Sequence, residues 1–424
     1  MTDALTRSQP ARFAHTLAEV PPAEEIRYPV ISVDDHAVEP GDLFVERLPA
    51  KFQDVAPRVV EDEDGNQFWT MGDRRAPILI SDMGSLGIPL KERRHDPIRF
   101  DELWPGATDV AERVRDMDKC GIVASLCFPS AVFGFAGRRF LELGPELGLA
   151  CVEAYNQWSA DVKAAYPDRF IAQQIVWLGD VEVAAEQVRR NAARGFTALS
   201  FSENPERQDL PSIYDGYWDP LFAACAETET AISLHVGSGS LLMIPSPRTP
   251  PPAHSILFPA NGILTAVDWI FSGVPSRFPD LKIAFSEAGI GWASMVAERM
   301  ERQEARGSMS PDRWAKQEGG DMWRQGFDGL AEPLIVPFRR NYYFATLGEP
   351  VAMRLRDHIG IDHIMVECDY PHSDAIFPHV QQEMAQSLDG LPEAEANMVA
   401  YQNAARVYRH PLPSLPGFPD LVQL

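Results

Sequence analysis

Short apolar runs alternate along this chain with longer stretches whose apolar residues recur at helical spacing. The runs predict eight buried strands, because each is rich in apolar or small side chains and is bounded by turn-forming residues. They cover 28–33, 122–128, 170–176, 196–201, 231–235, 281–286, 342–346 and 362–366. The stretches between them predict helices over 108–119, 145–165, 181–193, 263–271, 350–358, 378–388 and 394–408, with a further helix beginning at Asp219.

Local signals support these boundaries. Gly121 and Gly195 follow two of the predicted helices, where a left-handed glycine commonly ends a helix. Asp219-Pro220 predicts an N-cap followed by proline at the first helical position. Strands that alternate with helices predict a parallel α/β fold, and eight of them suffice to close a (β/α)8 TIM barrel. A doubly wound open sheet is the alternative, which is disfavoured because no Gly-rich phosphate loop follows any strand.

Three stretches interrupt the repeat within what we expect to be one domain over 1–424. Residues 37–106 follow the first strand, and Asp64-Gly65 within them predicts the turn of a small hairpin. Residues 237–262 are rich in Gly, Ser and Pro, and residues 300–340 are charged and contain Trp. The first two leave from the C-terminal ends of strands, so they are candidate lids or substrate walls; oligomer contacts are an equally good interpretation.

Composition narrows the function classes. Hydrophobic residues make up 45% of the 424 positions, enough for a large core, and the formal net charge of −23 argues against nucleic acid or an anionic membrane as a partner. The five cysteines are odd in number and form no CxxC, which favours buried free thiols in a reducing compartment. The N-terminus lacks an apolar signal core, and no stretch is long enough to cross a membrane. We therefore expect a cytoplasmic protein that acts on a small molecule.

Metal-ligand side chains stand at the ends of several predicted strands. Asp34 and His36 are two positions apart, so a strand places both on one face, whereas Asp35 points the other way and is expected to be structural. His235 ends an apolar strand, where a lone histidine is more often a satisfied core residue. Glu287 and Asp369 each follow an apolar strand as well.

Five such groups at the mouth of one barrel predict a metal centre. Buried unpaired carboxylates are costly, and no Lys or Arg stands in these strand ends. A divalent cation is the economical counter-charge, and His with carboxylates suits zinc, with manganese as the alternative.

The chain resembles the amidohydrolase superfamily, in the branch typified by aminocarboxymuconate semialdehyde decarboxylase. The resemblance runs from Val33-Asp-Asp-His-Ala-Val-Glu-Pro40 through Ser233-Leu-His235 and Phe285-Ser-Glu-Ala-Gly-Ile-Gly-Trp292 to Glu367-Cys-Asp-Tyr-Pro-His372, and ends at Asn403-Ala-Ala-Arg-Val-Tyr408. Order and spacing carry it rather than any one motif.

This resemblance implies specific roles. It makes His36, His235 and Asp369 metal ligands, with Asp34 at the position where the family usually has the first histidine. Glu287 replaces the usual histidine of strand 6, so the family's role at that position is in doubt. Strand 4 has no lysine, which favours one metal ion over a bridged pair. A homodimer is expected by analogy.

The net charge of the predicted metal centre favours a hydrolase. Three ionised carboxylates against one divalent ion leave about −1 at the centre, which repels an anionic substrate unless loop arginines reach it. The available arginines are Arg74, Arg75, Arg93 and Arg94. We therefore favour hydrolysis of a neutral ester, lactone or amide over decarboxylation of an aromatic or muconate-like acid; a third alternative is a ligand-binding barrel without catalysis.

Mechanistic roles follow for the remaining side chains. Asp369 is the expected proton shuttle, because it contacts both metal and water, and Glu287 is a ligand, a base or an orienting group. His372 lies just past the last strand, with a functional and a surface role equally open. The apolar loops at 133–135 and 241–244 predict a pocket for an aromatic compound, or packing beneath a lid.

Overall fold

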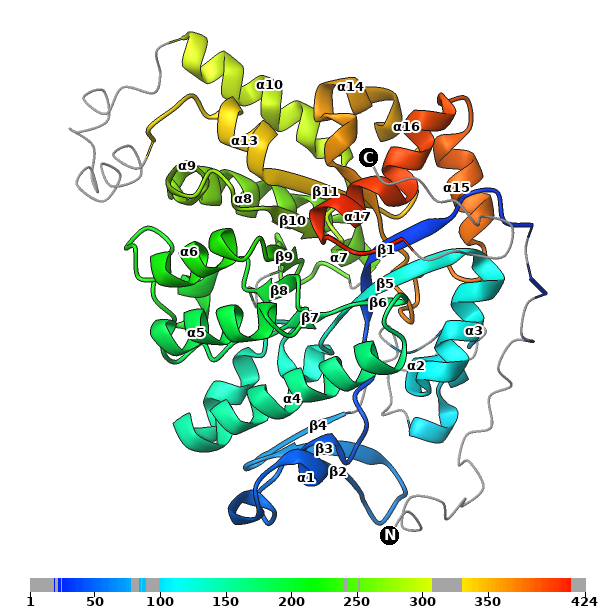
Figure 1. Cartoon of the computed structure of the whole chain (residues 1–424), viewed down its shortest axis with the longest axis vertical. Helices are drawn as coiled ribbons and strands as arrows, with labels where there is room; N and C mark the ends of the chain where they lie inside the picture. Colours follow the sequence, from blue (N-terminus) through cyan, green and yellow to red (C-terminus); the bar gives the residue numbers. More distant parts are fainter. Residues whose placement is uncertain are drawn as a thin grey trace.

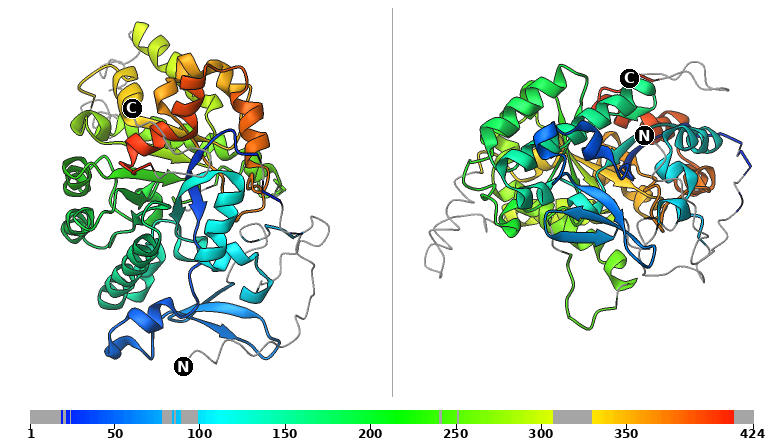
Figure 2. Two further views of the ribbon diagram at one scale, coloured as in Figure 1. Left: turned by 45° about the vertical axis from the view of Figure 1, so that its right-hand side comes forward. Right: turned by 90° about the horizontal axis from the view of Figure 1, so that it is seen from below.

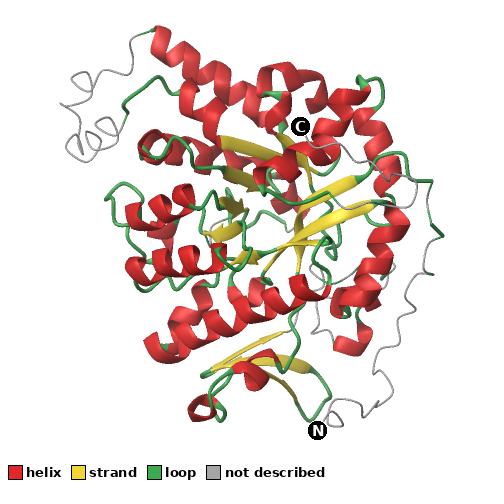
Figure 3. Ribbon diagram, in the orientation of Figure 1, coloured by secondary structure: helices red, strands yellow, loops and turns green. Residues whose placement is uncertain are grey.

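The computed structural model describes residues 25–77, 99–239, 242–250, 252–306 and 330–412, together with positions 19, 22, 23, 84 and 86–88. Strands lie at the centre and helices surround them (Figure 3). The central strands are β1 (Val30–His36), β5 (Ile122–Phe128), β6 (Phe170–Ile171), β7 (Gln173–Gln174), β8 (Ala198–Phe201), β9 (Ala231–His235), β10 (Ile283–Ser286), β11 (Tyr342–Thr346) and β12 (Ile364–Val366).

These strands form a closed parallel barrel. The sheet order is β6-β5-β1-β12-β11-β10-β9-β8-β7, and every pair in it is parallel. Its two ends, β6 and β7, are halves of one strand interrupted at Ala172: the first half pairs with β5 and the second with β8. The Ala172 carbonyl also accepts backbone hydrogen bonds from Thr197 and Ala198 of the β8 side. Eight strands therefore complete the ring, as the apolar runs predict.

Helices cover the outside of the barrel, which explains why the strands are apolar on both faces. All residues of β8 to β12 are buried. The helices are α3 (Val110–Cys120), α4 (Pro145–Ala165), α5 (Val181–Ala192), α6 (Asp219–Glu227), α8 (Phe258–Phe271), α9 (Val274–Arg277), α10 (Gly291–Ala305), α13 (Ile335–Asn341), α14 (Arg356–Ile359), α15 (Val380–Leu388), α16 (Glu393–Asn397) and α17 (Asn403–Val407), with a π-helical turn (Met398–Gln402) joining the last two. None of the helices in the described ranges has the length and apolar character needed to cross a bilayer.

Two local predictions meet different outcomes. Gly121 ends α3 in the left-handed conformation, as expected. The prediction that Asp219 caps α6 is wrong: Trp218 occupies the N-cap position, and no side chain caps this end. The Asp219 carboxylate instead accepts two hydrogen bonds from the Arg277 guanidinium at 2.9 and 3.2 Å, because the tertiary partner outcompetes the local one.

The insertion after β1 lies at the C-terminal end of that strand. It contains α1 (Leu43–Arg47) and an antiparallel sheet of β2 (Arg58–Glu61), β3 (Gln67–Met71) and β4 (Arg74–Pro77), so the predicted hairpin gains a third strand. Trp69 of this sheet packs edge-on against Phe133, which follows β5. The sheet therefore stands on the mouth side of the barrel, as Figures 1 and 2 show.

The other two insertions are described only in part. Between 237 and 262 the structure shows α7 (Pro252–Ile256), with Met243, Ile244 and Ile256 exposed. Leu241 of the predicted apolar loop lies outside the described residues, as do residues 307–329 of the third insertion. All five cysteines are free, four of them buried and Cys127 half-buried, as their odd number predicts.

Candidate metal centre

Four predicted ligands converge at the C-terminal ends of their strands, where catalytic groups of such barrels gather. His36 Nε2 lies 3.1 Å from Asp369 Oδ1 and 3.6 Å from Asp34 Oδ1. His235 Nε2 lies 3.2 Å from His36 Nε2 and 3.6 Å from Asp34 Oδ2. The strand ends of β1, β9 and β12 thus aim two imidazoles and two carboxylates at one point, as the period-two argument predicts.

This cluster is rich in buried acceptors that lack donors. Both carboxylate oxygens of Asp34 and Oδ2 of Asp369 are buried without a hydrogen-bond partner, and so is His36 Nδ1. Burial, reinforced by the nearby carboxylates, raises the pKa of Asp34 well above its ordinary value. Groups of this kind are expensive to leave unpaired, so the donor set fits a divalent cation. Ligand atoms of Asp34, His36 and His235 all lie within 4.8 Å of one another.

The two histidines are prepared for ligation in their neutral form. Burial lowers the pKa of both His36 and His235. The Nδ1 of His235 lies 2.7 Å from the Val236 carbonyl, which holds the proton on that nitrogen. The Nε2 lone pair of His235 therefore faces the cluster, where it would be available to a bound cation.

His372 belongs to the cluster rather than to the surface. Its Nδ1 lies 2.8 Å from Asp369 Oδ1 and 3.5 Å from Glu287 Oε1, and its ring stacks on His36 at 3.7 Å between centroids. Burial opposes protonation, but the carboxylates of Asp369 and Glu287 outweigh it and raise the pKa of His372 to about 10. Of the two open roles for His372, the position favours the functional one.

Glu287 joins the same group from β10. Its Oε2 lies 3.7 Å from His235 Nε2, and atoms of His36, Glu287, Asp369 and His372 form a second set within 4.8 Å. The backbone is left-handed at both Glu287 (φ 58°) and Asp369 (φ 56°), a conformation that non-glycine residues adopt at a cost. Both acids therefore sit where the tertiary structure imposes an unfavourable backbone shape.

A buried carboxylate beside the cluster holds that shape. Glu367 accepts the Glu287 N–H at 2.9 Å, while the Asp369 N–H donates to the Asp34 carbonyl at 2.8 Å. Burial raises the pKa of Glu367 well above its ordinary value, and the neighbouring carboxylates add to the effect. Sequence reasoning missed Glu367, although it precedes Asp369 by two positions at the same strand end.

Three more acids at strand ends support adjacent loops in the same way. Each follows its strand closely, each side chain accepts a backbone N–H of a neighbouring loop, and this recurrence is the signal that the sequence offered. The pairs are Glu39 with Ser130 N at 2.9 Å, Glu203 with Gly237 N at 2.8 Å and Glu349 with Ile290 N at 2.8 Å. Burial raises the pKa of Glu203 to about 8 and that of Glu39 to about 7. These carboxylates shape the mouth without being candidate ligands.

Arg113 is a buried cation near the cluster that the strand ends do not reveal, because it comes from α3. Its guanidinium donates to the carbonyls of His36 at 2.7 Å and Tyr370 at 3.1 Å, and it lies 4.0 Å from Asp35. Asp35 faces this arginine and accepts the Tyr370 N–H at 3.0 Å, so the prediction that it points away from the metal ligands is confirmed. The arginine thus braces the backbone behind the cluster from outside the barrel.

The loop arginines do not enter the cluster where the structure describes them. Arg74 pairs with Glu142 at 3.4 Å, and the Arg75 guanidinium lies 4.5 Å from the Phe68 ring. Arg93 and Arg94 lie outside the described residues.

Aromatic rings form one wall of the cluster. Phe135 stacks on the His235 ring at 4.3 Å, and Phe128 meets the same ring at 5.0 Å. Phe133, from the same predicted apolar loop, turns away and stacks on Phe140 at 5.2 Å. One of the two phenylalanines expected to line a pocket therefore borders the metal candidates, and the other supports the insertion.

Comparison with known proteins places this geometry in a wider context. A family model described as Amidohydrolase matches residues 66–410. An amidohydrolase from Mycobacterium avium subsp. paratuberculosis is similar in structure, with a TM-score of 0.68, 23% identity, and coverage of 91% of this chain and 100% of that one.

Two decarboxylases have related structures. A 5-carboxyvanillate decarboxylase from Novosphingobium aromaticivorans, with bound manganese and a nitrobenzoic acid, has a TM-score of 0.56 at 18% identity and covers 72% of this chain and 82% of its own. A 2,6-dihydroxybenzoate decarboxylase from Rhizobium has a TM-score of 0.55 at 16% identity, with coverage of 90% and 99%. At these identities the likeness shows the fold alone.

Proposed function

This chain belongs to the amidohydrolase family, and on that premise we propose that it is a metal-dependent, non-oxidative decarboxylase of an aromatic carboxylic acid. The observation that carries the proposal is the convergence of Asp34, His36, His235 and Asp369, in which both oxygens of the buried Asp34 carboxylate lack a hydrogen-bond donor. Asp34, His36, His235 and Asp369 would hold the ion, with Glu287 at the edge of the set. When bound, a divalent ion supplies a counter-charge and an electrophilic anchor for an anionic oxygen of the substrate.

Decarboxylation is favoured over hydrolysis by the position of His372. Three carboxylates against one divalent ion leave about −1 only when this histidine is left out of the balance. Its imidazole lies against both Asp369 and Glu287, where a protonated ring brings the balance from about −1 to about zero. A carboxylate substrate is then no longer repelled. The two similar decarboxylase structures support the same choice, and one of them contains manganese.

The residues around the centre supply the acid–base chemistry. When the bond to the carboxyl group breaks, carbon dioxide leaves and the electron pair stays on the ring carbon, which must then receive a proton. Asp369 is the proposed donor, and His372 at 2.8 Å is placed to return a proton to it. Glu287, fixed by Glu367, is placed to orient the substrate ring. The rings of Phe128 and Phe135 suit an aromatic substrate.

Product analysis tests the proposal. Protein loaded with Mn2+, and separately with Zn2+, would be incubated with hydroxylated benzoic acids and with aryl esters and lactones. Release of carbon dioxide from a benzoic acid, together with the ring product, is the expected result. Acid release from an ester or lactone with no carbon dioxide from any acid would refute decarboxylation.

Hydrolysis remains the second candidate, because Asp369 is equally placed to accept a proton from an attacking water. Metal content decides whether either enzyme function stands. Less than about half an equivalent of tightly held divalent metal, after loading and desalting, would refute both and favour a ligand-binding barrel.

A further inference from the structure

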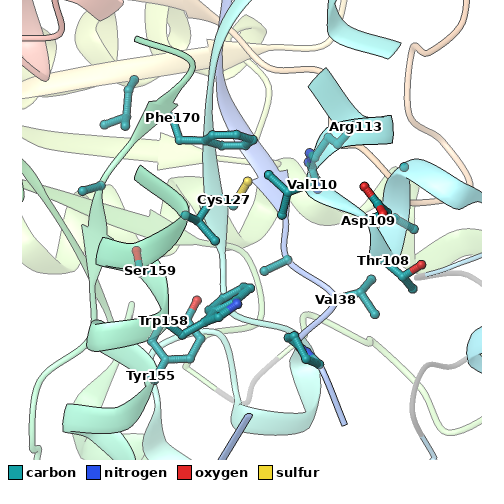
Figure 4. A pocket seen from close by; sticks show the side chains of 17 residues that line it. Val38, Thr108, Asp109, Val110, Arg113, Cys127, Tyr155, Trp158, Ser159 and Phe170 are labelled. Atoms are coloured by element: carbon teal, nitrogen blue, oxygen red, sulfur yellow. The ribbon is translucent and has the colours of Figure 1, made fainter. Parts of the chain in front are cut away.

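A cavity of about 80 Å3 lies between α3 and α4, beside β5 (Figure 4). Val110 and Arg113 of α3 form one wall, and Tyr155 and Trp158 of α4 stand opposite them. Cys127 of β5 lies between the two walls. The lining is mainly apolar, so the space is suited to an apolar guest.

The charged and polar groups of the lining are already engaged. The carboxylate of Asp109, at the rim, accepts the first backbone amides of α3, and Ser159 Oγ donates to the Gln173 carbonyl at 3.2 Å. The Arg113 guanidinium donates hydrogen bonds to two backbone carbonyls and faces Asp35. An anionic ligand would find no free cation in this lining, which favours an uncharged one.

Two side chains of α4 keep polar atoms available. Tyr155 is only 2% exposed, and in the described part of the chain its hydroxyl has no hydrogen-bond partner. The Trp158 indole N–H likewise meets no acceptor among the described residues. The Tyr155 hydroxyl is not sealed off from the cavity that its side chain lines, so a guest can reach it as a hydrogen-bond partner.

We propose that this cavity is a second ligand site, for an uncharged, single-ring aromatic compound that carries one hydroxyl or carbonyl group. A volume of about 80 Å3 is small for a ligand cavity, which limits the guest to a single ring. The ring packs between Val110 and Trp158, and its polar atom pairs with the Tyr155 hydroxyl.

Occupancy of this site is coupled to the metal centre. Arg113 lines the cavity and also donates to the carbonyl of His36, a proposed metal ligand. A ring packed against the guanidinium therefore alters the hydrogen bond that holds the His36 backbone. Binding in the cavity then changes the affinity for metal, and metal changes the affinity of the cavity by the same factor. The coupling rests on the proposed metal centre, whereas binding in the cavity does not.

Cysteine labelling tests the binding. Cys127 is the half-buried thiol in the lining, while the other four cysteines are buried. Saturating 4-fluorophenol is expected to slow its alkylation by N-ethylmaleimide, followed by peptide mass spectrometry, about threefold or more. Val162→Phe fills the cavity from α4 and should abolish this protection, while Leu147→Phe, on the same helix outside the lining, should retain it.

A second measurement covers the case in which Cys127 does not react. The fluorine resonance of 4-fluorophenol should broaden with the wild type and Leu147→Phe, and less with Val162→Phe. If Val162→Phe does not fold, Tyr155→Phe replaces it and should weaken binding about threefold or more. Equal broadening and equal labelling in wild type and the cavity variant would overturn the proposed site.

Manganese titration separates the two proposals. The Mn2+ affinity of the wild type is expected to change about fivefold in saturating 4-fluorophenol, and that of Val162→Phe to stay constant. An affinity that does not respond in the wild type would overturn the coupling. A protein that binds 4-fluorophenol in the cavity but never binds Mn2+ would refute the proposed function alone.

Discussion

Asp34→Asn is expected to stabilise the metal-free protein and to lower the stability that the protein gains on binding metal. Asp34 is fully buried, neither of its oxygens has a donor, and Glu367, Asp369 and Glu287 all repel its charge. A buried polar group left unpaired costs about 1–3 kcal/mol, and a charge costs more. Removing the charge while keeping the shape should therefore raise the free energy of unfolding of the metal-free protein by about 1–3 kcal/mol near neutral pH.

The gain should depend on pH. Because the pKa of Asp34 is raised in the folded state, the folded protein binds this proton more tightly than the unfolded chain does. The metal-free wild type therefore loses stability as pH rises above the unfolded value, until the folded pKa is passed. Asn carries no titrating group, so its advantage should be small near pH 4 and larger near pH 8.

Bound metal is expected to reverse the sign of the stability difference between the wild type and Asp34→Asn. A ligand at about 100 times its Kd adds about 2.7 kcal/mol to the wild type, and a variant with weaker affinity gains less. Urea unfolding of both proteins, with chelator and with Mn2+, near pH 4 and pH 8, measures all of these differences. Asp54→Asn, at an exposed position, is the matched control and should change none of them. A metal-free Asp34→Asn protein that is less stable than the wild type near pH 8 would refute the reasoning.

Asp369→Asn should lower carbon dioxide release about 100-fold or more while the circular dichroism spectrum stays unchanged; retained turnover would remove Asp369 as the proton donor. Glu367→Ala, which removes the acceptor for the Glu287 N–H, should lower kcat about tenfold, and Glu367→Gln, which keeps an oxygen there, should lower it less; equal losses would contradict a positioning role. His372→Phe keeps an aromatic ring over His36 but loses both carboxylate contacts. The KM of a carboxylate substrate should therefore rise more than the inhibition constant of its neutral amide analogue. An unchanged ratio of these two constants would argue against the counter-charge.

The convergence of the candidate metal ligands was predictable because it depends on local rules. Period two puts Asp34 and His36 on one face, and the parallel arrangement brings the strand end that carries His235 to the same edge. Eight apolar runs separated by helices leave few ways to bury both strand faces. The resemblance of the strand-end segments to one family then pointed to the same residues, and the family assignment is confirmed.

The chemistry was less predictable, because it depends on charges that meet only in the folded chain. His372 follows the last strand in a loop, and nothing in its neighbours in sequence shows that it reaches both Asp369 and Glu287. Omitting it made the centre look more anionic than its contacts indicate, and this favoured hydrolysis.

The sequence by itself determined the barrel and the gathering of buried carboxylates and histidines at its strand ends, since these follow from periodicity and from the parallel order of the strands. Only the tertiary structure decided which groups surround them. Arg113 reaches the His36 carbonyl across 77 positions, and Tyr155 meets α3 across a cavity. Such contacts depend on how helices pack around the barrel, which side-chain volumes and loop geometry decide together, and no local pattern encodes that packing.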